Sequence, residues 1–238
     1  MSAFQSSDVS VVITVFDNVT MIGEAIESVL GQTRPPGEVL VIDDGSTDGS
    51  GDVARSFGDR VRVVRQENQG ISASRNRAIS ETRGALIASV DADDRWAIHK
   101  LERQIPLLVS GVEGVTCHVA QVHESDWHAV VNGHREPEQV MRGPTWETLV
   151  IRREAFERVG GFDERYRIAE QIDWWMRAAD CGLSLAVIEE PLVYRRLHNE
   201  NHGIRHRDLR GAEYVRAIGT ALRRRREAAT APDPVPDT

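Results

Sequence analysis

The sequence predicts an α/β fold in which helices flank a mostly parallel central sheet. Segments of strand and helix character alternate from residue 9 to residue 90, and such alternation favours parallel strands joined by right-handed crossovers. The strand segments are continuous apolar runs, which are typical of strands buried on both faces. With 238 residues, of which 40% are hydrophobic and 28% charged, the chain can bury the core of one large domain.

The first part of the chain contains four strand segments separated by helices. Apolar residues recur with a helical period between Met21 and Leu30, until Pro35-Pro36-Gly37 interrupts the pattern. We expect strands at Val9–Val15, Glu38–Ile42, Val61–Val64 and Ala85–Val90, alternating with helices at Met21–Leu30, at Val53–Phe57 and at Ile71–Ile79.

The second part of the chain is less regular. The segment from His123 to Gly143 is polar and has little periodicity, so we expect an irregular loop there. Residues 227–238 are rich in proline and predict a disordered tail. We expect strands at Val115–Val122, Thr148–Arg152, Leu183–Ile188 and Leu192–Leu197, and helices at Arg153–Val159, Ile168–Cys181 and Tyr214–Arg226.

Charge and composition exclude several classes of protein. The net charge of −8 argues against nucleic acid as a partner. No apolar run approaches the roughly 20 residues of a membrane span, which predicts no stable membrane insertion. Met1 to Ser10 lacks a basic region followed by an apolar one, so we expect no secretory signal. Two cysteines favour a reducing compartment, and we expect a cytoplasmic protein.

Polar clusters follow three of the predicted strands, at the point where each strand ends. These clusters are Thr14–Asn18, Asp43–Asp48 and Asp91–Asp94. In open α/β sheets, ligands bind at the carboxyl ends of the strands. We therefore expect the three clusters to meet at one rim and to form a binding site there.

Three carboxylates within four residues mark the last of these clusters. Asp91, Asp93 and Asp94 repel one another, and a divalent cation such as Mg²⁺, which prefers oxygen ligands, would remove that repulsion. The alternative is a solvated acidic turn in which an aspartate caps the helix predicted near Ala97. The convergence on one rim favours the cation.

A second feature of this rim suits a diphosphate. Gly70–Asn76 opens a predicted helix whose N-terminus would face the same rim, and it carries Arg75. Helix N-termini and arginine both bind anions. The chain contains neither GxGxxG nor GxxxxGK[ST], which argues against a dinucleotide site and a P-loop.

Taken together, these motifs resemble those of family 2 glycosyltransferases of the GT-A fold. The resemblance extends to about Asn201 and implies one GT-A domain over residues 1–226, with a donor-binding half at about 8–110, an acceptor half at about 111–205 and a C-terminal helix at about 206–226. The motifs that carry it are Thr14–Asn18, Val41–Asp48, Ser74–Asn76, Asp91–Asp94 and Phe156–Asp163.

The resemblance implies transfer of a sugar from a nucleotide-diphosphate donor, most commonly a UDP-sugar, with inversion at the anomeric carbon. Phe16 would stack on the nucleobase and Asp44 would hydrogen-bond it. Asp93 would contact Mn²⁺ or Mg²⁺, which neutralises the departing diphosphate. The implied nucleotide-sugar site is Thr14, Phe16, Asp44, Arg75 and Asp91, and the implied metal site is Asp93 and His198.

Each of these side chains also has a purely structural interpretation. Phe16 could belong to the core, and Asp44 could cap the following helix. Arg75 could be an ordinary surface arginine, while His198 could hydrogen-bond near the last strand.

The chain departs from the family pattern at the catalytic base. Members commonly carry Glu-Asp where this chain has Glu170-Gln171, and an amide cannot accept a proton at neutral pH. Glu170 or Asp173 could replace the base, since residues three apart share a helix face. We expect Glu170 to be the base and Asp173 to brace the helix. Both carboxylates also suit a helix start electrostatically.

Two other functions stay open. Gln171 is consistent with a degenerate protein that binds a nucleotide sugar without turnover. A sugar nucleotidyltransferase is disfavoured because Thr14–Asn18 lacks a Gly-rich, basic loop. The acceptor is a saccharide, a lipid-linked molecule or a peptide, and a homodimer is one arrangement that the sequence allows.

Overall fold

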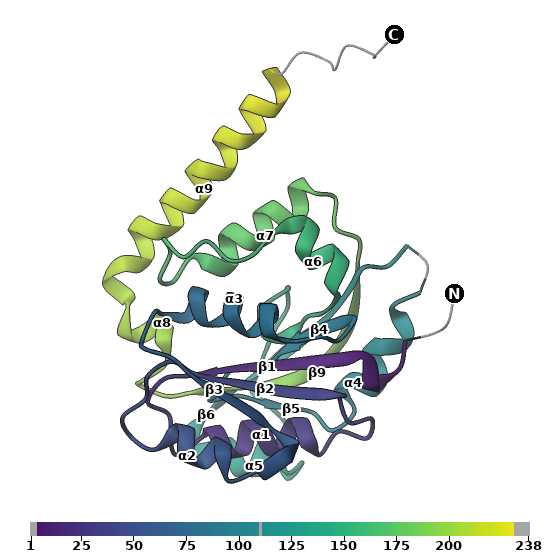
Figure 1. The fold of residues 1–238 in the computed structure, drawn as a ribbon, viewed down its shortest axis with the longest axis vertical. Coiled ribbons are helices and arrows are strands. Elements are labelled where there is room, and N and C mark those ends of the chain that lie inside the picture. Colours follow the sequence, from purple (N-terminus) through teal and green to yellow (C-terminus); the bar gives the residue numbers. More distant parts are fainter. Residues whose placement is uncertain (1–3, 110, 231–238) are drawn as a thin grey trace.

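The computed structural model describes residues 4–109 and 111–230 and has the predicted α/β fold (Figure 1). Nine strands form one curled central sheet in the order β3-β2-β1-β4-β8-β6-β9-β5, and β7 pairs with β6. The strands are β1 (Val9–Val15), β2 (Glu38–Asp43), β3 (Arg62–Arg65), β4 (Leu86–Ser89), β5 (Arg95–Trp96), β6 (Gly114–His123), β7 (Gln139–Met141), β8 (Val150–Arg152) and β9 (Leu185–Leu197).

The helices lie on both faces of this sheet. In Figure 1, α1, α2 and α5 lie below the sheet, while α3, α6 and α7 lie above it. A short 3₁₀ helix, η5 (Trp146–Thr148), precedes β8. The helices are α1 (Ile22–Leu30), α2 (Ser50–Arg55), α3 (Ile71–Glu81), α4 (Lys100–Gln104), α5 (Trp127–Val131), α6 (Arg153–Val159), α7 (Glu170–Asp180), α8 (His202–Arg205) and α9 (Arg207–Thr230).

Most of the strand pairing is parallel, as predicted. β1 pairs in parallel with β2 and β4, β2 with β3, and β6 with β9. β8 is antiparallel to both β4 and β6, and it joins the two parts of the sheet. The parallel arrangement of β1, β2 and β4 brings their carboxyl ends to one edge of the sheet, where the polar clusters after these strands were predicted to meet.

The two faces of β1 contribute to two separate cores. Val11 and Ile13 pack in a cluster with Ile26 of α1. Val12, which points to the other face, packs in a cluster with Ala78 of α3. All five side chains are 0% exposed. Alternate residues of a strand point to opposite faces, so a continuous apolar run is what a sheet covered on both faces needs.

Two expectations for the second part of the chain are wrong. The segment His123–Gly143 contains α5 and β7 rather than an irregular loop, and Trp127 of α5 is 1% exposed. Two separate strands were expected at 183–197, but β9 runs continuously through Pro191, with register shifts against β6 near His118. The bulge accommodates a proline that cannot donate a ladder hydrogen bond.

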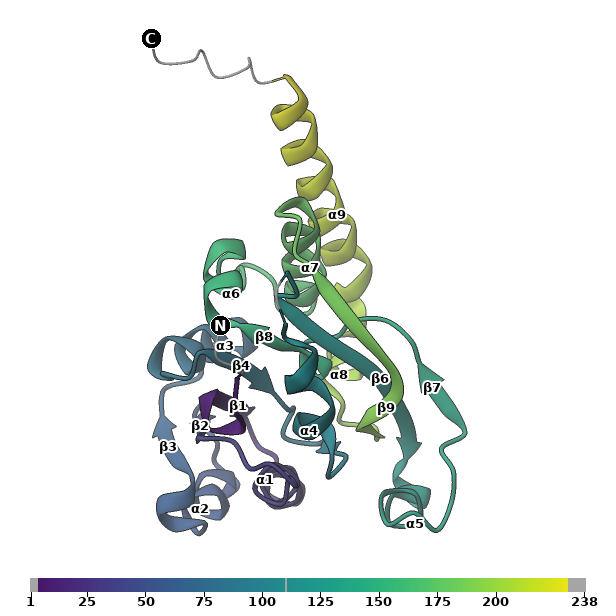
Figure 2. The ribbon, with the colours of Figure 1, turned by 90° about the vertical axis from the view of Figure 1, so that its right-hand side faces the viewer.

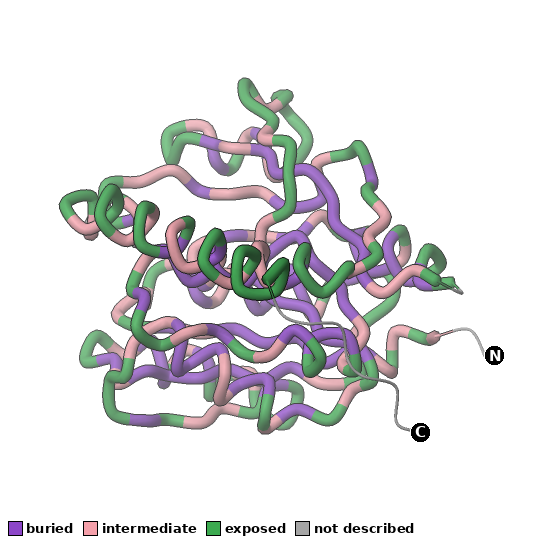
Figure 3. Tube along the Cα trace, turned by 90° about the horizontal axis from the view of Figure 1, so that it is seen from above, coloured by how far each residue is buried: buried purple, intermediate pink, exposed green. Residues whose placement is uncertain are grey.

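α9 packs against α7 and then extends beyond the body of the protein (Figure 2). Its carboxylate Glu213 accepts hydrogen bonds from the backbone N–H groups of residues 167, 168 and 169, just before α7 begins. Arg224 pairs with Asp173 of α7 at 3.2 Å. Most other residues of α9 are exposed, as Figure 3 shows. α9 continues to Thr230, into the predicted tail, and the rest of that tail lies outside the described residues.

Among the described residues, none of the helices has the length and apolar character that crossing a membrane requires.

A buried lysine gives the first testable prediction. Lys100 is 0% exposed, its Nζ lies 4.0 Å from the centroid of the Trp96 ring, and burial lowers its pKa to about 8. The unfolded state, with a lysine pKa near 10.4, binds more protons between about pH 8 and 10.4, so stability contributed by this group rises with pH across that window. Lys100→Met should raise the free energy of unfolding at pH 7 by about 1–3 kcal/mol.

Urea unfolding in EDTA-containing buffer at pH 7 and pH 9 would measure this effect. Arg103→Met, on the same helix but half-exposed, is the matched control and should change stability little. A Lys100→Met protein that is less stable than wild type at pH 7 would show that the Trp96 contact outweighs the cost of burial.

Candidate functional site

A cleft of about 820 Å³ opens at the carboxyl ends of β1, β2 and β4. All three predicted polar clusters contribute to its wall, together with the start of α3 and the segment after β9. Its lining includes Thr14, Phe16, Asp44, Asp48, Ser72, Asp91, Asp93, Tyr166, Arg167, Arg195, His198 and Asn201. The cleft therefore contains all of the residues expected at the donor and metal sites except Arg75.

Phe16 and Thr14 lie at the end of the cleft formed by β1. The side chain of Phe16 is 44% exposed, which places it outside the core. An aromatic ring held at the mouth of a cleft offers an apolar face to a planar ligand. This position is consistent with the predicted stacking role.

Asp44 organises the loop that leads into α3. Its Oδ1 accepts hydrogen bonds from Gln66 Nε2 at 2.7 Å and from the Gln69 N–H at 2.9 Å. Its Oδ2 accepts one from the Gly70 N–H at 2.9 Å. A carboxylate has about four acceptor sites, so Asp44 keeps capacity for one donor from a ligand. It does not cap α2, whose N-cap is Gly49.

Arg75 lies beneath the cleft and is 1% exposed. Its Nη2 donates to Asp91 Oδ1 at 3.0 Å and its Nη1 donates to Glu170 Oε1 at 2.9 Å. In this structure the guanidinium orients two carboxylates from different elements, and the surface interpretation does not hold. A direct contact of Arg75 with the diphosphate stays a prediction.

Asp93 lies against the segment that follows β9. His198 Nε2 lies 3.0 Å from Asp93 Oδ2, and Asn201 Nδ2 donates to the same oxygen at 3.1 Å. Burial opposes ionisation of Asp93, but the hydrogen bond from His198 and its charge hold the pKa below the ordinary value. Two residues that are far apart in the chain, Asp93 and His198, thus form the pair that was expected at the metal.

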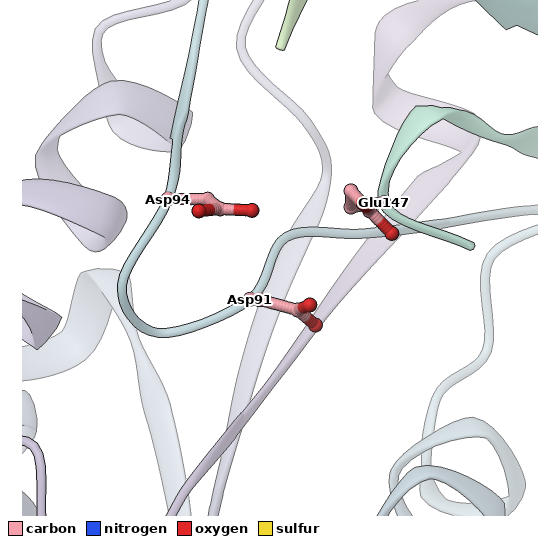
Figure 4. A group of neighbouring side chains, drawn as sticks. All are labelled: Asp91, Asp94 and Glu147. Atoms are coloured by element: carbon pink, nitrogen blue, oxygen red, sulfur yellow. The ribbon is translucent and has the colours of Figure 1, made fainter. Parts of the chain in front are cut away.

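A second group of carboxylates consists of Asp91 and Asp94, from the same turn as Asp93, and Glu147 (Figure 4). Asp91, Asp94 and Glu147 offer oxygen atoms that all lie within 4.8 Å of one another. Asp94 and Glu147 are each 2% exposed, and Asp94 Oδ1 accepts a hydrogen bond from the Arg196 N–H at 3.1 Å. Sequence reasoning missed Glu147, because η5 lies outside every motif and carries no signal of its own.

The three residues around the expected base have distinct surroundings. Glu170 is 4% exposed and holds Arg75, whereas Asp173 is 2% exposed and pairs with Arg177 at 2.8 Å. Gln171 Oε1 accepts a hydrogen bond from the Trp146 N–H at 2.9 Å. Neither carboxylate belongs to the wall of the cleft, and the identity of the base stays a prediction.

Comparison with known proteins identifies the group to which the chain is similar. The model of the family "Glycosyl transferase family 2" matches residues 10–171. An uncharacterized glycosyltransferase of Nostoc sp. is 29% identical over 219 residues, which cover 82% of this chain and 66% of that protein. The chain thus spans less than two thirds of that relative.

Two solved structures have the same fold. A mannosyltransferase from Pyrobaculum calidifontis, in complex with GDP-Man and Mn²⁺, superimposes with a TM-score of 0.66 and 23% identity, over 91% of this chain and 64% of that one. TarS from S. aureus, in complex with UDP, gives a TM-score of 0.66 and 18% identity, over 90% and 65%. At these identities the likeness supports the fold alone.

Proposed function

The chain belongs to glycosyl transferase family 2, and from that premise we propose that it transfers a sugar from a nucleoside-diphosphate sugar to an acceptor hydroxyl. The observation that carries the proposal is the cleft at the carboxyl ends of the neighbouring strands β2, β1 and β4, which takes Asp44 and Phe16 from the ends of β2 and β1 and Asp91 and Asp93 from the end of β4. This order matches the order of base, diphosphate and sugar in such a donor.

We propose that the carboxylate of Asp44 recognises the nucleobase of the donor by accepting a hydrogen bond from it. The free acceptor site on Asp44 suits a donor group on the pairing edge of the nucleobase, such as the ring N–H of uracil or guanine. TarS was solved with UDP and the Pyrobaculum enzyme with GDP-Man. We propose a UDP-sugar as the donor, with a GDP-sugar as the alternative.

The residues at Asp93 fit a divalent cation. A carboxylate and a histidine nitrogen, 3.0 Å apart on the cleft wall, are a donor set that Mn²⁺ accepts. We propose that Asp93 and His198 would hold the ion, with Asp91 supporting its shell. Mn²⁺ or Mg²⁺ would supply the positive charge that makes a nucleoside diphosphate a better leaving group.

The protein's own groups would position the reaction. Phe16 stacks on the base, and Asp91, oriented by Arg75, contacts the ribose or the sugar. An acceptor hydroxyl attacks the anomeric carbon from the side opposite the diphosphate, which gives inversion. A carboxylate removes its proton, and we propose Glu170 for this role. The acceptor is a saccharide, a lipid-linked molecule or a peptide.

Release of nucleoside diphosphate from a panel of UDP-, GDP- and CDP-sugars, with Mn²⁺, Mg²⁺ or EDTA, tests this proposal. We expect metal-dependent release from a UDP-sugar or, in the alternative, from a GDP-sugar. Metal-dependent binding without release would identify a degenerate protein. Formation of pyrophosphate from a nucleoside triphosphate and a sugar phosphate would identify a nucleotidyltransferase.

A further inference from the structure

We propose that Asp91, Asp94 and Glu147 form a second divalent-cation site, beneath the cleft, that binds its ion without any nucleotide. The site differs from the pair of Asp93 and His198 proposed for the donor, although Asp91, which would support the shell of that ion, belongs to both groups. Binding of an ion at this second site is a property beyond glycosyl transfer, because it requires neither a sugar donor nor an acceptor.

The first argument is geometric. The three carboxylates come from two places in the chain, the turn after β4 and the helix η5, and they point toward one another (Figure 4). Three oxygens that all lie within 4.8 Å of one another leave a point between them that is no more than about 2.8 Å (4.8 Å divided by √3) from any of the three, close to the 2.3–2.6 Å of Ca²⁺–oxygen bonds. A small inward movement would suit Mn²⁺, and Mg²⁺ would require a larger one.

The second argument is an oxygen without a partner. Glu147 is 2% exposed, and its Oε2 is buried with no hydrogen-bond partner among the described residues. Leaving a buried charged acceptor unsatisfied is costly. Glu147 offers a carboxylate oxygen to the group that it forms with Asp91 and Asp94, so a cation held between the three would give this buried carboxylate a partner.

The third argument is that η5 holds Glu147 in this place firmly. The ring of the preceding Trp146 is 2% exposed and packs on Phe162 at 4.9 Å and on Trp174 at 5.6 Å between ring centroids. Gln171 accepts a hydrogen bond from the Trp146 N–H at 2.9 Å. These contacts fix the backbone on one side of Glu147, so the carboxylate cannot easily turn to the solvent.

The fourth argument is charge. Among the described residues, five carboxylates gather in and beside the proposed site and four cationic side chains act on them electrostatically, so the group keeps a negative charge that a bound cation would reduce. The carboxylates are Asp91, Asp93, Asp94, Glu147 and Glu170, and the cationic residues are Arg75, Arg195, Lys100 and His198.

Titration of the nucleotide-free protein with Mn²⁺ tests the site, and electron paramagnetic resonance measures the free ion at each step. We expect one bound Mn²⁺ per chain in wild type and in Asp93→Asn. Glu147→Gln keeps the shape of the side chain and removes its charge, and it should weaken this binding by more than about tenfold. Ca²⁺ should compete, and should raise the melting temperature of wild type but not of Glu147→Gln.

Other outcomes would overturn the proposal. Absence of nucleotide-free binding in wild type would mean that the three carboxylates share protons instead of a metal. Binding that survives in Glu147→Gln and is lost in Asp93→Asn would place the only ion at the donor site. Asp94→Asn serves as the second variant if circular dichroism shows that Glu147→Gln is misfolded. Donor turnover is measured separately, so a failure of the glycosyltransferase proposal would not affect this result.

Discussion

Asp93→Asn should lower metal-dependent turnover of the donor by about 10²- to 10³-fold, while the protein stays folded. Asp93 is the carboxylate that faces the cleft with His198, and removing its charge weakens the site of an ion that stabilises the leaving group by several kcal/mol. Binding of UDP in the presence of Mn²⁺ should weaken as well. Isothermal titration and release of nucleoside diphosphate would measure the two effects.

Two controls make the result specific. Asp59→Asn removes an aspartate from an exposed 3₁₀ helix on the surface, and it should leave turnover unchanged. In EDTA, wild type and Asp93→Asn should bind UDP equally weakly. Unchanged UDP affinity and turnover of Asp93→Asn with Mn²⁺ would rule out this residue as the ligand.

The part of the fold that could be predicted is the part whose strands are buried on both faces. The run Val9–Val15 is buried along almost its whole length, and the neighbouring strands β2 and β4 are buried in the same way. Short elements could not be predicted in this way. α5 has five residues and buries only Trp127 and Val130, so it shows no helical period. β7 is formed by three residues that pair with β6, and edge pairing leaves no apolar pattern.

The residues of the candidate site also fall into two groups, those that the sequence identifies and those that only the fold brings together. Asp91 and Asp93 are two residues apart in the chain and follow a strand, so their type and position could be recognised together. The depth of Arg75 could not be predicted, because a sequence does not tell whether a guanidinium ends at the surface or, as here, is buried between the carboxylates of Asp91 and Glu170. Glu147 lies far along the chain, and only the pairing of β8 with β4 brings η5 to the acidic turn.

The helix α7 shows why the base is difficult to assign. Gln171, at the position where the family commonly has aspartate, holds the backbone of Trp146 at 2.9 Å. Glu170 and Asp173 lie on either side of it and are both buried, but they face different partners. Glu170 contacts Arg75, which also holds Asp91 of the cleft. Asp173 contacts Arg177 and, on α9, Arg224.

Glu170→Gln should therefore lower turnover by about 10²-fold or more, with donor affinity nearly kept. The Glu170 carboxylate is linked to Asp91 of the cleft through Arg75, which hydrogen-bonds both. The amide of the Glu170→Gln variant cannot take the proton of the acceptor hydroxyl. Loss of a general base should also remove the acidic limb of the pH–rate profile. A variant that only disturbs Arg75 would instead raise KM and keep the shape of the profile. Steady-state kinetics between pH 5 and 9 would distinguish the two.

Asp173→Asn is the matched variant on the same helix, and it should affect stability rather than chemistry. It removes the charge that pairs with Arg177 at 2.8 Å and with Arg224 at 3.2 Å, and breaking a buried pair costs about 3–5 kcal/mol at most, less where a partner is solvent-exposed. We expect earlier urea unfolding and a kcat within a few-fold of wild type. A folded Asp173→Asn protein without turnover, beside a fully active Glu170→Gln protein, would reverse the two roles. If both variants keep wild-type turnover, the proton leaves through a group outside α7, and Gln171→Asp, which restores the family's carboxylate, should then leave the rate unchanged.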